Sequence, residues 1–222
     1  YFAYKPAILH FAVSLMVAAI ATFVVFGIWY PAPLDQLADG RTILWILVCV
    51  DLISGPVLTL IVAAPDKGRL ALWGDLAVIC LIQLAALSYG VLALYDARPV
   101  YLAYEGDRFR VVSVPDIDPR AKTIGEMVNE PLPLWGPKPI GVRLLDPSDP
   151  TYLHSLQQAV AGNHPAFRPD RWLPYSNQRQ QILREASPLS KLVVGGEVTS
   201  QTVSAWLERN NQTREQVMYL PL

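Results

Sequence analysis

Apolar residues are crowded into the first 95 positions of this chain, where they form three runs over about residues 8–30, 43–64 and 72–95. Each run has roughly 22 residues, so a helix rising about 1.5 Å per residue would reach roughly 33 Å, the thickness of a hydrocarbon core. The first run ends in Trp29-Tyr30-Pro31, an aromatic anchor that favours a permanent span over a cleaved signal peptide. The pattern predicts that residues 1–95 form three transmembrane helices in a lipid bilayer.

Residues 96–222 have a different pattern, in which short β-rich runs and amphipathic segments alternate with proline-rich connections. The segments 99–104 and 108–114 flank Glu105-Gly106-Asp107 and predict a β-hairpin. An irregular connection is expected over 115–147. Further along we expect helices at 153–160, 176–186 and 200–210, one turn opened by Ser187-Pro188, and a final strand at 217–222. The predicted fold class is a membrane protein with three transmembrane α-helices followed by a small α+β soluble domain.

Charge narrows the function classes for this second part. Residues 96–222 contain 14 basic and 14 acidic side chains, so a basic surface for nucleic acid is not expected. Both cysteines, Cys49 and Cys80, fall within the apolar runs, which leaves the soluble part without a disulfide or a cysteine metal site.

The orientation of the spans is predicted from basic residues near their ends. With the N-terminus in the cytoplasm, Lys5, Lys67 and Arg69 lie inside, against Arg41 and Arg98 outside. Three spans then place the C-terminal domain on the far side of the membrane.

Polar residues within the spans fall at helical spacing, so each span has one small or polar face. The first face is His10, Ser14, Ala18, Ala21 and Val25; the second is Asp51, Ser54, Gly55, Leu58 and Thr59; the third is Asp75, Ile79, Gln83, Ala86 and Gly90. An ionised Asp51 in mid-membrane costs roughly 2.5 to 3.5 kcal/mol on insertion scales, so a partner is expected.

Three interpretations of these faces remain open. They could pack only against one another, with Asp51 bonded to Gln83 or to a Ser or Thr hydroxyl. One face could instead receive a fourth helix from a partner. A proton or ion path through Asp51, Asp75 and His10 is a third interpretation, and it would require a homo-oligomer to build a pore. By depth, His10 and Asp75 could be neighbours.

A search for chemistry finds no nucleophile motif, zinc motif, phosphate-binding loop or dinucleotide fingerprint. His154 and His164 have no evident metal-ligand companion. The sequence therefore predicts a protein that is not an enzyme and has no cofactor or metal.

Several strings resemble a known family over about the first 115 residues. They are Lys5-Pro-Ala-Ile-Leu-His10, Trp29-Tyr-Pro-Ala-Pro-Leu34, the ten residues from Asp51 to Leu60, Asp75-Leu76 with Gln83, Tyr89-Gly90, and the thirteen residues from Ala97 to Phe109. These resemble the type IV pilin accessory proteins of the TfpX/TfpZ family.

The resemblance implies a protein of the bacterial inner membrane with a periplasmic domain, which assists a cognate type IV major pilin without enzymatic activity. On this hypothesis the pilin membrane helix docks on the spans at His10, Asp51, Ser54, Gly55, Asp75 and Gln83. Arg98, Glu105, Asp107 and Arg108 would contact the pilin globular domain, or would form a local cluster of salt bridges that braces the domain. The competing class is a membrane-anchored envelope sensor or structural subunit.

Overall fold

The computed structural model describes residues 4–37, 40–63, 68–121, 127, 130–194 and 200–222. It divides into two compact units, Tyr1–Pro99 with Leu134–Gly136, and Val100–Pro133 with Pro137–Leu222. Ala64, the last residue of the predicted second span, and Lys67 lie outside the described residues.

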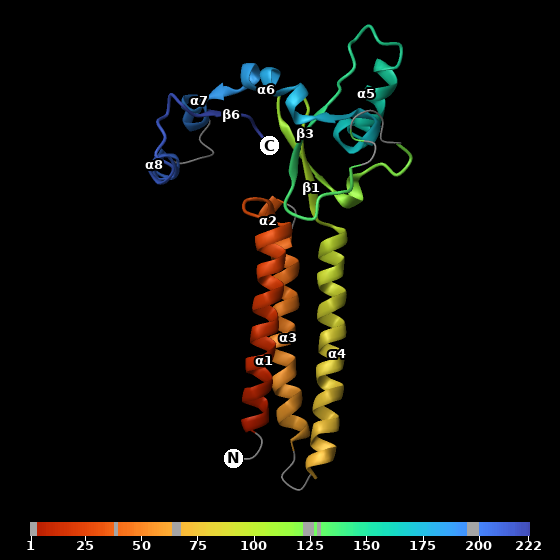
Figure 1. Cartoon of the computed structure of the whole chain (residues 1–222), viewed down its shortest axis with the longest axis vertical. Helices are drawn as coiled ribbons and strands as arrows, with labels where there is room; N and C mark the ends of the chain where they lie inside the picture. The colour runs from red at the N-terminus through yellow and green to blue at the C-terminus, as the bar shows by residue number, and fades with distance from the viewer. Residues whose placement is uncertain (1–3, 38–39, 64–67, 122–126, 128–129, 195–199) are drawn as a thin grey trace. The chain divides into compact units, whose positions relative to one another are not determined.

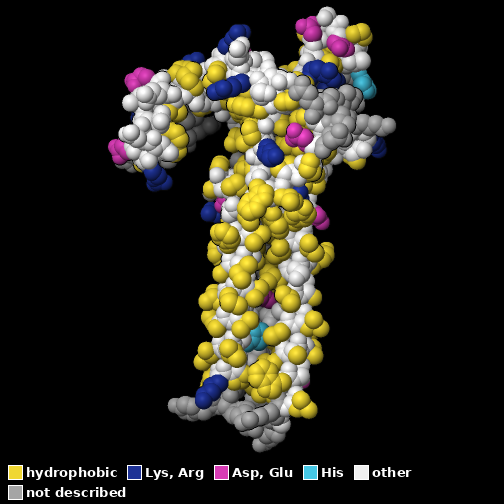
Figure 2. All heavy atoms as spheres, in the orientation of Figure 1, with side chains coloured by type: hydrophobic (Ala, Val, Ile, Leu, Met, Phe, Trp, Pro, Cys, Tyr) yellow, Lys and Arg dark blue, Asp and Glu magenta, His cyan; other side chains and the backbone are white. Residues whose placement is uncertain are grey.

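The first unit contains three long apolar helices, as the sequence predicts (Figure 1). They are α1 (Tyr4–Val24), which continues into a π-helical turn at Val25–Trp29, α3 (Gly40–Val62) and α4 (Arg69–Asp96); the one-turn helix α2 (Leu34–Leu37) lies between α1 and α3. Each of α1, α3 and α4 has the length and the apolar composition needed to cross a membrane. Figure 2 shows hydrophobic side chains over the face of this unit that is in view, as expected where lipid is the solvent.

Small residues hold the helices close together. The predicted face of the first span is buried along its whole length, and its members are His10, Ser14, Ala18, Ala21 and Val25. α1 packs against α3, and α3 packs against α4. Near the end of the first span, the Tyr30 hydroxyl donates to the carbonyl oxygen of Leu94 at 2.9 Å, and the Tyr30 ring lies 2.7 to 3.1 Å from the position of a Cβ built on Gly40.

The second unit is built on a four-stranded sheet with strand order β2-β1-β3-β4. The predicted hairpin forms from β1 (Pro99–Tyr104) and β2 (Phe109–Ser113). Its turn is closed by a bond of 2.9 Å from the Glu105 N–H to the carbonyl oxygen of Arg108, and Gly106 has φ of +97°, which glycine adopts readily.

The prediction of a wholly irregular segment over 115–147 was wrong, because β3 (Lys138–Val142) lies within it. β3 pairs in parallel with β1 and antiparallel with β4 (Trp172–Pro174). Proline and glycine are uncommon in strands, so Pro139 and Gly141 kept the sequence pattern from predicting this one. The amide group of Gln178 stabilises the end of β3, since it donates to the carbonyl oxygen of Val142 and accepts from the Val142 N–H, each at 2.9 Å.

The core of this unit is packed on the sheet. Its buried members are Val100, Tyr101, Ala103, Val112, Met127, Ile140, Val142, Ala166 and Trp172. Trp172 lies edge-on to Tyr101 with ring centroids 4.8 Å apart, and its indole N–H donates to the carbonyl oxygen of Ala166 at 2.8 Å. The indole therefore has both an aromatic neighbour and a satisfied polar atom.

The remaining helices follow the predictions closely, with changes at their ends. α5 (Tyr152–Val160) and α8 (Ser200–Arg209) match them, whereas α6 (Arg179–Glu185) is shorter because a 3-10 turn precedes it at Tyr175–Asn177. Ser187 and Pro188 form a short strand, β5, which pairs antiparallel with β6 (Met218–Tyr219), and the helical turn α7 (Leu189–Val194) begins after it.

Candidate functional site

A chain of polar side chains crosses the interior of the three-helix unit. His10 of α1 lies between the other two helices: its Nδ1 is 2.6 Å from the hydroxyl of Thr59 on α3, and its Nε2 is 2.7 Å from Oε1 of Gln83 on α4. Because the Gln83 oxygen can only accept, Nε2 carries the hydrogen, and in a neutral imidazole Nδ1 then accepts from Thr59. His10 and Thr59 are both buried.

Gln83 extends this chain to the aspartate in the middle of α3. Its Nε2 donates to the backbone oxygen of Asp51 at 2.9 Å and to Oδ1 of the Asp51 carboxyl group at 3.0 Å; the Ser54 hydroxyl is 3.4 Å away. The predicted bond between Asp51 and Gln83 is therefore present. Hydrogen bonds between membrane helices contribute about 0.6 to 2 kcal/mol each, so this intramembrane network, formed by His10, Asp51, Ser54, Thr59 and Gln83, helps to hold the three helices together.

Gly55 makes the network possible by its lack of a side chain. A Cβ at this position would lie 2.7 Å and 2.8 Å from the amide atoms of Gln83 and 2.9 Å from Nε2 of His10. Such separations are too short for atoms that are not bonded to each other. The glycine lets Gln83 and His10 meet directly over the α3 backbone.

One side of the network is incomplete. Asp51 is half-buried, and only Oδ1 of its carboxyl group has a hydrogen-bond partner among the described residues. Oδ2 thus remains able to accept a bond from a group outside the helices. Leu58 lies seven residues beyond Asp51, on the same face of α3, and is 42% exposed.

The predicted faces of the second and third spans are only partly internal. In α3, Gly55 and Thr59 are buried, whereas Asp51 and Ser54 are half-buried. In α4, Ile79 is buried, Asp75, Gln83 and Gly90 are half-buried, and Ala86 is exposed. The two ring nitrogens of His10 have Thr59 and Gln83 as partners, and not Asp75. Asp75 lies eight residues before Gln83 on α4, which corresponds to about 12 Å along the helix axis.

The four charged residues predicted after the third span differ in their burial and in their hydrogen-bond partners. Arg98 is buried, donates to the carbonyl oxygen of Tyr95 at 2.8 Å and lies over the Tyr95 ring. Asp107 and Arg108 form an exposed pair with contacts of 2.8 Å and 3.1 Å, and Arg108 lowers the pKa of Asp107. Of the four, only this pair is on the surface.

The side chain of Glu105 links two separate segments of the second unit. Its carboxylate accepts from Nε of Arg110 at 2.6 Å and from the Ala166 N–H at 3.1 Å, and its side chain is 9% exposed. The sequence does not reveal this role, because Ala166 is 61 residues away.

We expect Glu105→Ala to lower the free energy of unfolding of the second unit by about 2 kcal/mol, because it leaves a buried N–H and a half-buried cation unpaired. Urea unfolding of the purified full chain in detergent, followed by tryptophan fluorescence, measures the change. Asp107→Ala is the control and should change stability by less than about 0.5 kcal/mol, because the pair it breaks is exposed. Equal losses in both variants would contradict the role of Glu105.

The fold and the network define a membrane protein with three apolar helices and a small helix-and-sheet domain. Comparison with known proteins assigns it more closely. Residues 1–39 match the family described as fimbrial assembly protein FimB.

The chain is 30% identical to the fimbrial assembly protein of serogroup I from Dichelobacter nodosus, over 100% of this chain and 86% of the relative. The serogroup E1 protein of the same organism is 30% identical, with the same coverage, and that of serogroups C1 and C2 is 36% identical over 52% of this chain and 88% of the relative. No solved structure matches significantly. The chain belongs to the family of fimbrial assembly proteins, and its role is in fimbrial biogenesis.

Proposed function

We propose that this protein binds a cognate type IV major pilin in the bacterial inner membrane and supports its stability or its assembly into pili, as expected of a TfpX/TfpZ accessory protein. The role is chaperone-like and not catalytic. The N-terminus would be cytoplasmic and the helix-and-sheet unit periplasmic, so that the protein could contact both the membrane helix and the globular domain of the pilin.

The half-buried carboxyl group of Asp51 carries this proposal. Placing a carboxyl group in the middle of an apolar helix is costly, and Gln83 satisfies only one of its two oxygens. If Asp51 served only to pack the helices together, a polar group enclosed on all sides by the three helices would serve equally well. An oxygen that can still accept a bond suits a surface that waits for another helix.

The incoming group is a hydrogen-bond donor. An unassembled pilin presents an apolar helix that is close in length to these spans, and polar groups on that helix would face the same desolvation cost as Asp51. Asp51 would accept from such a group in mid-membrane. Asp75 would lie nearer the cytoplasmic end of its span and would face the charged amino end of the mature pilin.

Co-purification of the pilin with the tagged full chain tests the proposal. We expect Asp51→Leu, Asp75→Leu and Gln83→Leu each to reduce pilin recovery about tenfold, equivalent to about 1.4 kcal/mol. Ile53→Ala is the control, because Ile53 is exposed on the opposite face of α3. Undiminished recovery with all three variants would rule out docking at these residues, and a stable homo-oligomer that holds no pilin would favour an envelope sensor or structural subunit.

A further inference from the structure

The helix α5 has its apolar side exposed to solvent. Leu153, Leu156 and Val160 share one face by their spacing, and they are 75%, 51% and 84% exposed. No residue of α5 is buried. An amphipathic helix that turns its apolar face outward is typical of an interaction surface.

A pocket of about 240 Å³ opens beside this face. Its lining is mainly apolar and includes Leu144, Leu145, Tyr152, Leu156, Ala159 and Pro165. Leu156 belongs to both the exposed face and the pocket wall. The two features form one surface, which we call the α5 surface, and it is concave enough to take an apolar side chain.

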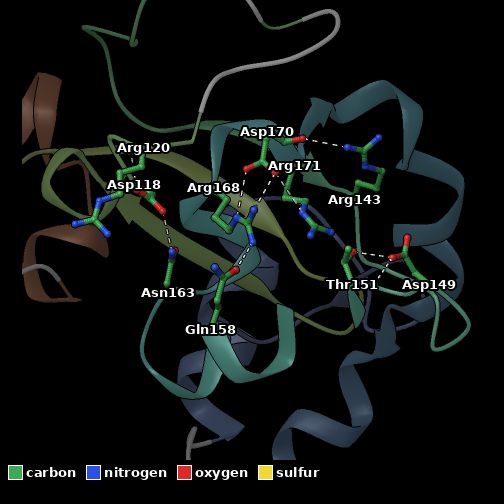
Figure 3. Close-up of polar contacts among 10 residues, drawn as sticks. All are labelled: Asp118, Arg120, Arg143, Asp149, Thr151, Gln158, Asn163, Arg168, Asp170 and Arg171. Atoms are coloured by element: carbon green, nitrogen blue, oxygen red, sulfur yellow. Dashed lines mark hydrogen bonds and ion pairs between the residues drawn. The ribbon is translucent and has the colours of Figure 1, made fainter. Parts of the chain in front are cut away.

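Three arginines gather next to the α5 surface, around a single aspartate (Figure 3). Asp170 accepts from Arg168 at 3.1 Å and 3.3 Å, and its Oδ2 is 3.6 Å from Nε of Arg171. Arg143 donates to the Asp170 backbone oxygen at 3.2 Å. Arg143 directly precedes the pocket residue Leu144, so the cluster adjoins the pocket along the chain.

Arg171 is not fully satisfied within this cluster. Its side chain is 8% exposed, and its Nη1 is buried without a hydrogen-bond partner among the described residues. Burial lowers the pKa of Arg171, as do the neighbouring cations Arg168 and Arg143. In Figure 3 Arg171 extends toward the turn that precedes α5, where Asp149 accepts from Thr151 and adds a second negative charge that acts on Arg171.

The charges in this region do not balance. Among the described residues, Arg120, Arg143, Arg168 and Arg171 face three carboxylates, those of Asp118, Asp149 and Asp170, and each of these carboxylates already accepts hydrogen bonds. An added carboxylate would restore neutrality. Bidentate geometry makes arginine well suited to bind one.

We propose that the α5 surface binds an acidic, apolar segment of the globular domain of the pilin: an apolar side chain enters the pocket, and an adjacent carboxylate meets the exposed Arg143, beside the buried Arg171. This inference rests on the proposed function and names the part of the second unit that recognises the partner. Specificity for one pilin would then depend on the match between this surface and a pilin segment.

Co-purification and a binding titration of the full chain, in detergent, with the full-length cognate pilin test the inference. We expect Leu156→Asp and Arg143→Glu each to weaken pilin binding about tenfold, whereas Arg143→Lys retains most of the affinity. Leu183→Asp and Arg184→Glu are matched controls, because they make the same changes at exposed positions of α6. Thermal unfolding verifies that the variants fold, which the exposure of Leu156 and Arg143 leads us to expect.

Salt dependence isolates the contribution of charge. Raising the salt concentration should weaken binding by the wild type and should have less effect on Arg143→Gln. If the wild type captures pilin and both α5-surface variants capture it equally well, the inference is overturned while the proposed function stands. If the wild type captures no pilin, both are overturned.

Discussion

Replacing Gly55 by leucine is expected to destabilise the three-helix unit by about 3 kcal/mol or more. The new Cβ would meet both amide atoms of Gln83 and the Nε2 atom of His10 at 2.7 to 2.9 Å. Relief of the clash requires the Gln83 amide and the His10 ring to move away from α3, or α3 and α4 to separate. Either change breaks the bonds from Gln83 to His10 and Asp51 and leaves polar groups unpaired in an apolar medium. Thermal unfolding of the purified chain in nanodiscs measures the loss, and the steady-state amount in the membrane should fall with it.

Gly74→Leu is the matched control for this experiment. Gly74 also lies within a membrane span, but no heavy atom lies within 4 Å of a Cβ built there, so the leucine would project into open space. We expect a change of less than about 0.5 kcal/mol. Equal stability of the two variants would show that Gln83 and His10 do not meet over Gly55.

The second large effect is expected in the other unit, where Trp172→Ala should lower the free energy of unfolding by about 3 to 5 kcal/mol. The substitution removes a buried indole from the centre of the core, together with its contact to Tyr101. It also leaves the buried carbonyl oxygen of Ala166 without its donor. Urea unfolding of the full chain in detergent, followed by circular dichroism, measures the change.

Trp206→Ala is the control for Trp172. Trp206 is 49% exposed on α8, so we expect its loss to change stability by less than about 1 kcal/mol. The opposite order of effects would contradict the placement of Trp172 in the core.

Features with a local signature could be predicted from the sequence. The apolar run lengths predicted the three helices, and the three-to-four spacing from His10 to Val25 predicted the internal face of α1. The bond between Asp51 and Gln83 was predicted as one alternative, because each was a conspicuous polar residue at mid-span and few partners were available.

Features that depend on distant pairings could not be predicted in this way. β3 contains Pro139 and Gly141, and it is stabilised by Gln178, whose amide is 36 residues from the Val142 backbone that it pairs with. Arg143 and Arg171 come together because β3 pairs with β4, and the Arg143 N–H donates to the carbonyl oxygen of Arg171 at 2.8 Å. Their similar depth in the predicted spans suggested that His10 and Asp75 could be neighbours. The helix packing instead brings His10 to Gln83 and Thr59.

Site-specific crosslinking inside the membrane tests the central claim most directly. A photoreactive residue is placed at Leu58, on the Asp51 face of α3, or at Ile53, on the opposite face, in cells that produce the cognate pilin. Docking at the intramembrane network predicts a crosslink to pilin from position 58 that is lost with Asp51→Leu, and little from position 53. No crosslink from position 58, or equal crosslinks from both positions, would contradict a pilin-binding face at Asp51.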